Sequence, residues 1–433
     1  MTPRAAARSI FDSALRAGDV RPLVLRALPR VEPPRRGRLI VVGAGKAGAA
    51  MAAAVEEALG PRVDDGVVAV KDQHLAPTRR VRLIEAGHPV PDERGAAAAR
   101  EIVATAEPAG SDDLVLVLIS GGASALLPAP APPITLGDKQ AVTRLLLAAG
   151  ANINQLNAVR KHLSLLKGGQ LARAAAPARV HALLLSDVIG DPLDVIGSGP
   201  TAPDVSTFAD ARAVLDTFGV VDRAPASVVE RIARGARGEI AETPKPEDPL
   251  FGCVENVVIG NNGLVVEAAA ARAAELGYTP HVLTRALEGE ARVVAKQWVE
   301  LARRIAARQG PVAPPACVIA GGETTVTVRG EGRGGRCQEF ALAAALELDG
   351  LDSVVVLAAG TDGTDGPTHA AGAAVDGGSA LRARERGHDP RARLAANDSH
   401  PVLADVGDLI VTGPTNTNLL DLYLLIVSAP THA

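Results

Sequence analysis

Short uninterrupted apolar runs recur along the chain, and stretches with helical spacing separate them. Runs at 38–43, 114–120 and 182–186 are typical of strands that are buried on both faces of a parallel sheet. Alanine-rich segments at 47–59 and 93–106 have the length and the periodicity of helices. This alternation of strand and helix predicts βαβ units, and therefore an α/β fold.

Three further segments of the first half are predicted to be helical, because their apolar residues recur every three or four positions. They cover residues 5–28, 138–149 and 152–176. We expect the last of them to end at Gly168-Gly169 or shortly beyond, since glycine commonly follows the end of a helix.

The pattern is interrupted at 235–252, where three prolines lie among acidic side chains. Such a segment predicts a surface linker. Behind it the alternation of strand and helix resumes, with expected strands at 317–320 and 324–329. We therefore predict two α/β domains, residues 1–250 and residues 251–433.

Composition narrows the function classes. The 433 residues are 47% hydrophobic and 22% charged, as in ordinary globular proteins of two or three domains. A net charge of −4 and an aromatic content of 2% argue against nucleic-acid or anionic-membrane partners. Cys253, Cys317 and Cys337 lack zinc or disulfide spacing, which favours a reducing compartment. With no targeting or membrane-spanning pattern, we expect a cytoplasmic protein and leave a homo-oligomer open.

The first loop with candidate chemistry is Gly43-Ala-Gly45-Lys46-Ala-Gly48, between an expected strand and an expected helix. It matches the GxGxxG dinucleotide fingerprint, in which glycines allow close approach and helix amides face an anion. Asp72 could serve as the acidic residue that such a site needs. Lys46 suits a phosphoryl group or a carboxylate better than a nicotinamide ring. A tight turn with an exposed lysine is the alternative.

Small and polar residues follow two of the expected strands. Ser120-Gly121-Gly122-Ala-Ser124 offers hydroxyls and amides to an anion, or else forms a glycine turn that caps the next helix. Asp187 ends the later strand. A carboxylate there can accept a hydroxyl proton or bind Mg²⁺, or it can form an Asx turn.

Two arginines lie near these loops or in loops of their own. Arg160 lies on the expected helix 152–176, where a solvated charge is the simpler interpretation. Arg336 ends the glycine-rich segment 330–336. An arginine in such a loop can stabilise charge on a transferring phosphoryl group, and a hairpin turn with a surface arginine is the alternative.

Asp362 and Asp365 are three residues apart in a loop of glycines and threonines. Such carboxylates can bind Mg²⁺ or a ribose, whereas the order and length of a calcium-binding EF-hand loop are missing.

Taken together, these loops resemble those of the glycerate 2-kinase family, the class II glycerate kinases with a MOFRL-type C-terminal domain. The resemblance covers nearly the whole chain and rests on the joint order of its motifs. These are GAGKAG (43–48), SGGASALL (120–127), NAVRKHLSLLKGG (157–169), SDVIGDPLDVIGSGPT (186–201), GGETTV (321–326), GRGGRCQE (332–339), GTDGTDGPTHAAGA (360–373), and NDS with TGPTNTN (397–399, 412–418).

The resemblance implies a larger Rossmann-like domain with a doubly wound parallel sheet, a smaller α/β domain, and an active site in the cleft between them. It implies transfer of the γ-phosphoryl group of ATP to the 2-hydroxyl of D-glycerate, with Mg²⁺, to give 2-phosphoglycerate and ADP. Lys46 and Arg336 are then the expected catalytic cations. Asp187 is the expected base or metal ligand, and Asp362 a further metal ligand.

The contacts expected for the two substrates follow from the same resemblance and from what phosphoryl transfer requires. The glycerate carboxylate is expected on the Ser120–Ser124 loop, namely on Ser120, Gly121, Gly122 and Ser124, with help from Arg160. The nucleotide is expected to contact Gly43, Gly45, Asn261, Asn262, Gly321, Gly322, Glu323, Thr324, Thr361 and Asp362.

Four positions depart from the pattern expected for this family: Ala123, Cys337, His369 and Leu420. Two alternative functions stay open. One is an NAD(P)H-dependent hydroxypyruvate reductase, which the GxGxxG match would serve. The other is a non-catalytic sensor that binds a phosphorylated ligand.

Overall fold

The computed structural model describes residues 1–351 and 353–429, which divide into two compact units. The continuous unit comprises Val20–Ile259, and the split unit joins residues 1–19 to the chain from residue 260 onward. We expected a division at residue 250 with the N-terminal helix in the first domain, and the structure differs on both points. Among the described residues, no helix is long and apolar enough to cross a bilayer.

The expected linker at 235–252 is an ordered part of the continuous unit. The Thr243 hydroxyl donates to the buried Asp204 carboxylate at 2.9 Å, and Glu242 accepts a hydrogen bond from the Phe208 amide at 2.9 Å. The strand that follows, β6 (Val254–Gly260), is the edge strand of the first sheet. The chain therefore leaves the continuous unit after β6, not before it.

The continuous unit contains a six-stranded sheet with the order β3-β2-β1-β4-β5-β6. β1 pairs in parallel with β2 and β4, β2 with β3, and β4 with β5. This order is that of a doubly wound, Rossmann-type sheet, so the expected fold class is confirmed. The strands before β6 are β1 (Leu39–Ala44), β2 (Val63–Lys71), β3 (Arg82–Ala86), β4 (Leu114–Ile119) and β5 (Arg179–Leu185).

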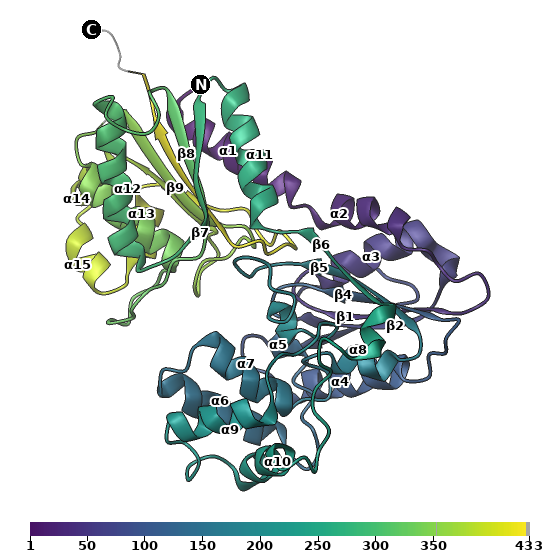
Figure 1. Ribbon diagram of the computed structural model, residues 1–433. Coiled ribbons are helices and arrows are strands. Elements are labelled where there is room, and N and C mark those ends of the chain that lie inside the picture. The colour runs from purple at the N-terminus through teal and green to yellow at the C-terminus, as the bar shows by residue number, and fades with distance from the viewer. Residues whose placement is uncertain (352, 430–433) are drawn as a thin grey trace. The chain divides into compact units, whose positions relative to one another are not determined.

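Helices cover both faces of this sheet (Figure 1). Because side chains alternate along a strand, Val42 and Val117 face the core under α4, α5 and α8, while their neighbours face α3. The helices and short 3₁₀ turns are α2 (Val20–Ala27), η1 (Leu28–Arg30), α3 (Gly48–Leu59), η2 (Gly60–Arg62), α4 (Glu93–Ala106), α5 (Ala123–Leu126), α8 (Gln170–Ala175), η3 (Ile196–Ser198) and η4 (Pro249–Cys253).

A second helical layer with its own apolar core belongs to the same unit (Figure 1). It consists of α6 (Leu136–Ala148), α7 (Ile153–His162), α9 (Phe208–Thr217) and α10 (Ala226–Ala236). The prediction of one helix over 152–176 is wrong, because α7 ends at His162 and α8 begins only at Gln170. Gly168 and Gly169, with φ of 58° and 77°, take the left-handed backbone conformation that turns the chain.

The split unit contains a mixed six-stranded sheet with the order β11-β10-β9-β12-β8-β7. The last strand of the chain, β12, lies between β8 and β9 and is antiparallel to both. Its strands are β7 (Thr279–Leu287), β8 (Ala316–Gly322), β9 (Val354–Gly360), β10 (Gly372–Asp376), β11 (Leu409–Ile410) and β12 (Asp421–Val427). The expected strand at 324–329 is wrong, since this segment makes only a single bridge between Thr325 and Glu290.

α12 and α13 pack on one face of this sheet, and α1 and α11 pack on the other (Figure 1). The expected helix 5–28 is interrupted at Gly18, and its first part joins this unit, where Arg4 forms ion pairs with Asp376 and Asp408. The helices are α1 (Pro3–Ala17), α11 (Asn262–Glu275), α12 (Ala291–Ala306), α13 (Arg336–Leu348), α14 (Ser379–Glu385), α15 (Pro390–Ala395) and α16 (Ser399–Asp405).

The packing of α10 on α9 generates a stability prediction. A Cβ on Gly235 would lie 2.2 Å from Cγ of the buried Phe208 ring. We expect Gly235→Ala to lower the free energy of unfolding by about 1–3 kcal/mol, because overpacking forces core side chains to move. Gly110→Ala is the control, since its Cβ would meet no atom within 4 Å. Urea unfolding of both variants tests this, and equal stabilities would contradict it.

Candidate functional site

The carboxyl ends of β1, β4 and β5 lie side by side, because these three parallel strands end in register. Lys46, Ser120 and Asp187 follow these ends within one to three residues. The strand order reverses between β1 and β4, and doubly wound sheets bind their ligands at such a point. The structure thus brings these three predicted residues to one edge of the sheet.

The glycines of the GAGKAG loop serve the packing of two loops. Gly45 has φ of 140°, and a Cβ there would lie 2.0 Å from Ser120 Oγ. The amides that follow are already bonded: Lys46 donates to the Gly121 carbonyl at 2.8 Å, and Ala47 donates to Ser120 Oγ at 3.0 Å. These amides would have to be free to bind the pyrophosphate of a dinucleotide. The glycine motif therefore fixes the loop after β1 (residues 45–48, the β1 loop) against the loop after β4 (residues 120–124, the β4 loop).

The acidic residue that a dinucleotide site would need is also engaged elsewhere. Asp72 receives both terminal nitrogens of Arg94, at 2.6 and 2.8 Å. The bonded amides of the glycine loop therefore count against the reductase alternative, whereas the exposed ion pair of Asp72 is weak and decides nothing.

The Lys46 side chain lies beside the glycine turn of the β4 loop. A Cβ on Gly122, whose φ is 85°, would lie 3.5 Å from Lys46 Cγ and 3.0 Å from the His88 ring. Glycine is required here both for its backbone conformation and for this close approach. The amides of Gly121 and Gly122 have no hydrogen-bond acceptor among the described residues. The loop therefore offers two amides close to a lysine, as the anion-site hypothesis expects.

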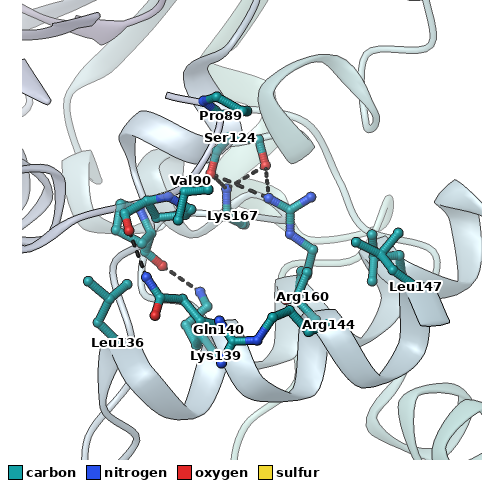
Figure 2. Close-up of a pocket in the computed structure, with 14 residues that line it drawn as sticks. Pro89, Val90, Ser124, Leu136, Lys139, Gln140, Arg144, Leu147, Arg160 and Lys167 are labelled. Carbon is teal, nitrogen blue, oxygen red and sulfur yellow. Dashed lines mark hydrogen bonds between the residues drawn. The ribbon is translucent and has the colours of Figure 1, made fainter. Parts of the chain in front are cut away.

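A cavity of about 310 Å³ lies next to this loop, between α6, α7 and the segment that follows β3 (Figure 2). Arg160 and Lys167 point from two sides toward Ser124 (Figure 2). Arg160 donates to Ser124 Oγ at 2.7 Å, while Lys167 donates to the Ser124 carbonyl at 2.8 Å and to Oγ at 2.9 Å. Arg160 is thus a cavity residue, and the interpretation of it as a solvated charge is wrong.

Two lysines of this cavity were not found by sequence reasoning. Lys167 and Lys139 are both buried, and Lys139 donates to the Pro128 carbonyl. Burial, and then the positive charge of Arg160, hold the pKa of each lysine well below its ordinary value. Burial also lowers the pKa of Arg160. The available signal was the scarcity of lysine in a chain whose cations are mostly arginines, combined with a lysine directly before a Gly-Gly turn.

In the split unit, Arg336 is the first residue of α13 and is held by two carboxylates. Its Nε and one terminal nitrogen bond both oxygens of Asp421, at 2.5 and 2.9 Å, and the other terminal nitrogen lies 2.7 Å from Glu323. Burial disfavours the charge, but the hydrogen bond and negative charge of Asp421 outweigh it and raise the pKa of Arg336. The guanidinium is therefore charged and fixed in orientation.

Asp421 is the first residue of β12, and it is only 1% exposed. The register places it opposite Gly322 at the end of β8 and Gly360 at the end of β9. The Tyr423 hydroxyl donates to it at 3.1 Å, and the Thr324 amide in turn donates to Tyr423 Oη at 3.2 Å. This network joins the ends of three strands and fixes the GGET loop.

Several residues expected to contact the nucleotide also hold these loops together. Asn261 caps α11 by accepting from the Leu264 amide, and the Asn262 side chain donates to the carbonyls of Leu419 and Asp421. Thr361 Oγ1 donates to the Leu420 carbonyl at 2.7 Å. Their role in nucleotide binding stays a prediction.

Leu420 has φ of 65°, a left-handed conformation that strains a leucine. Asparagine adopts this backbone conformation more readily than leucine does.

The two carboxylates of the GTDGTDG loop have different tasks. Asp362 accepts from the amide and hydroxyl of Thr364, at 3.0 and 3.1 Å. Asp365 caps α13, because it accepts from the amides of Cys337 and Gln338 at 3.1 and 2.8 Å. The buried helix terminus is thus occupied by a protein carboxylate. In the described part of the chain, His, Cys, Asp and Glu form no group of three or more that could hold a metal ion.

Known proteins resemble this chain over most of its length. The chain matches the model of a domain of unknown function, DUF4147, over residues 6–233, and the MOFRL family model over residues 316–421. A D-glycerate 2-kinase from Thermotoga maritima is 42% identical over 388 residues, which cover 89% of this chain and 90% of that protein. The chain belongs to the glycerate 2-kinase family.

Further similarities extend over the whole length of this family member. The crystal structure of a glycerate kinase from Thermotoga maritima superimposes with a TM-score of 0.89 at 40% identity and covers 98% of this chain and 99% of that chain. A protein of Agrobacterium vitis that carries the provisional name hydroxypyruvate reductase is 45% identical over 430 residues, or 99% of this chain and 95% of that protein.

The buried cap of α13 generates a pH prediction. Burial raises the pKa of Asp365 to about 6, against about 3.9 in an unfolded chain. Between these values the folded protein binds more protons than the unfolded one, so this contribution to stability is present below about pH 4 and lost as pH rises through 6.

We therefore compare the wild type with Asp365→Asn, which has no titrating group at this position. The free energy of unfolding of the wild type relative to the variant should be about 2 kcal/mol larger at pH 4.5 than at pH 7. Denaturant unfolding at the two pH values measures this, and a difference that does not change with pH refutes it.

Proposed function

We propose that this protein transfers the γ-phosphoryl group of ATP to the 2-hydroxyl of D-glycerate and releases 2-phosphoglycerate and ADP. The observation that carries the proposal is the basic cavity beside the β4 loop, where Arg160 and Lys167 converge on Ser124. A small carboxylate is the kind of ligand that such a set of buried cations accepts. The similarity to glycerate kinases over nearly the whole chain supports the same substrates.

In this proposal the glycerate carboxylate binds to the Ser124 end of the cavity and to the amides of Gly121 and Gly122. Lys46, beside the same turn, then faces the hydroxyl end of the substrate and the phosphoryl group that it receives. A lysine there lowers the barrier by neutralising charge that builds up on the phosphoryl oxygens during transfer.

Arg336 has the second cationic role. Three of its five N–H groups are engaged by Asp421 and Glu323, which leaves two for a phosphoryl group. Because the two carboxylates fix its orientation, little reorganisation is needed when the phosphoryl group arrives. The GGET and GTDGTDG loops near Arg336 are the proposed nucleotide contacts.

Asp187, at the end of β5, is the proposed acceptor of the proton of the 2-hydroxyl or a ligand of Mg²⁺, and Asp362 is a second candidate ligand. Mg²⁺ at kinase sites is held by one or two protein carboxylates together with phosphates and water. Single carboxylates in oxygen-rich loops fit that requirement. The ion would neutralise nucleotide phosphate charge, while the residues named above position the acceptor.

The first prediction of this proposal concerns Lys46. Lys46→Ala should lower kcat at least about a hundredfold, since loss of one charge-stabilising group commonly costs this much. Lys71→Ala, at the end of the neighbouring strand β2, should keep kcat within about threefold. A coupled assay of ADP formation with D-glycerate measures both variants, and thermal unfolding confirms that they are folded.

Arg336 generates a parallel prediction. Arg336→Ala and Arg336→Lys should each lower kcat at least about a hundredfold, because a lysine keeps the charge but not the planar fork of donors. Arg336→Lys also retains a positive charge for the buried Asp421, which guards against unfolding. Arg333→Ala, in the same glycine-rich loop, is the control. Normal turnover in Lys46→Ala and both Arg336 variants would refute the proposed mechanism.

The same assay separates the alternatives. A reductase would oxidise NADH in the presence of hydroxypyruvate without ATP, and a sensor would bind without turnover. Consumption of ATP that depends on D-glycerate, with no oxidation of NADH, is the expected result.

A further inference from the structure

Two buried lysines near α7 differ in the partners that balance their charge. Lys161, 3% exposed, is paired with Asp194 and Asp204, each at 3.2 Å. Lys167, 2% exposed, has no carboxylate partner among the described residues, and its ammonium group donates only to Ser124 there. A buried cation normally needs a counter-charge, as Lys161 has. The described chain therefore supplies no counter-anion for Lys167, and a ligand could provide one.

The other charges around the cavity increase this imbalance. Lys139, Arg144 and Arg160 line the cavity with Lys167, and no described residue of the lining is acidic. The neighbouring charges of Arg160 and Lys139 disfavour the charge of Lys167 further, after burial itself, and keep its pKa low. An anion that enters the cavity reverses this repulsion and is held strongly.

Ser124 holds the side chains of Arg160 and Lys167 close together. Its hydroxyl contacts Arg160 and Lys167 (Figure 2). The same hydroxyl lies 2.8 Å from the buried Ser198 hydroxyl, which sets its position. The ammonium group of a lysine has three N–H donors, of which Ser124 engages two, and the guanidinium of Arg160 has more donors than Ser124 engages. Donors therefore remain on both side chains, toward the cavity that both line.

We propose that Lys167 binds the carboxylate of the acceptor substrate together with Arg160, and that this pair makes the enzyme specific for a hydroxy acid. The inference rests on the proposed function and adds Lys167 to the residues that contact glycerate. Ser124 positions the two cations but is neutral, so the substrate carboxylate supplies their counter-charge. A neutral polyol of the same length would leave both buried cations without their counter-charge, and so would bind poorly.

The test compares Lys167→Met with the wild type under steady-state conditions. Methionine keeps the length and apolar stem of lysine but not the charge. The KM for D-glycerate should rise at least about thirtyfold, while the KM for ATP stays within about threefold. Lys296→Met is the matched control, because Lys296 is an exposed lysine of α12 that does not line the cavity, and both KM values should stay within about threefold.

A second measurement needs no turnover. D-glycerate alone, without ATP, should raise the Tm of the wild type and of Lys296→Met but not that of Lys167→Met. Lys167→Arg, which restores the charge, should recover part of this shift and lower the KM relative to Lys167→Met. A purely structural role of Lys167 would lower the Tm of the unliganded protein and affect both substrates equally.

The outcomes separate the two proposals. If the wild type shows no ATP consumption that depends on D-glycerate, the proposed function fails. If the wild type turns over and Lys167→Met keeps its KM for D-glycerate and its Tm shift, the role of Lys167 is refuted while the kinase assignment stands. A selective rise of the D-glycerate KM, partly reversed in Lys167→Arg, supports the inference.

Discussion

The contact between the β1 loop and the β4 loop is the constraint that sets the positions of Lys46 and of the Ser120–Ser124 loop. The Ala47 amide donates to Ser120 Oγ, and the absence of a side chain at Gly45 makes that approach feasible. With the two loops locked together, Lys46 lies over the Gly122 turn, and the next residues of the β4 loop lead to Ser124. A motif that resembles a cofactor fingerprint thus brings a lysine next to the loop that leads to the cavity lined by Arg160 and Lys167.

In the split unit, a strand instead of a loop contact fixes the position of a cation. An antiparallel strand, β12, lies between two strands that run the other way, so that its first residue meets the last residues of both neighbours. This places the buried Asp421 where it can hold Arg336, and Tyr423 two residues later holds Asp421. The charges of Arg336 and Asp421 are therefore already oriented in the unliganded protein.

Much of the fold was predictable because it follows from local periodicity. The helix expected at 93–106 matches α4, and the strongest apolar runs are the central strands of their sheets. Periodicity was misleading where the decisive partner is remote in sequence. Gly168 and Gly169 end a helical pattern early, and acidic residues around Glu242 are hydrogen-bonded to the continuous unit instead of forming a linker.

The site was predictable to the extent that loops at the ends of parallel strands carry it. The structure brings Lys46, Ser120 and Asp187 to one sheet edge, as their positions after strands indicated. Lys167 was missed because its significance depends on what it lacks, a carboxylate partner, and a sequence does not show partners. The sequence left Asp365 open as a contact to Mg²⁺ or a ribose, whereas in the structure it caps a helix that begins about thirty residues earlier.

The attachment of α1 to the split unit has a consequence for how the chain is made. Residues 1–19 leave the ribosome before the continuous unit, yet the ion-pair partners of Arg4, Asp376 and Asp408, are synthesised only after that unit. The intervening continuous unit has all of its strands before then and can fold while the leading helix waits. The order of synthesis therefore lets the continuous unit fold first, and α1 packs into its own unit only after the rest of that unit has been made.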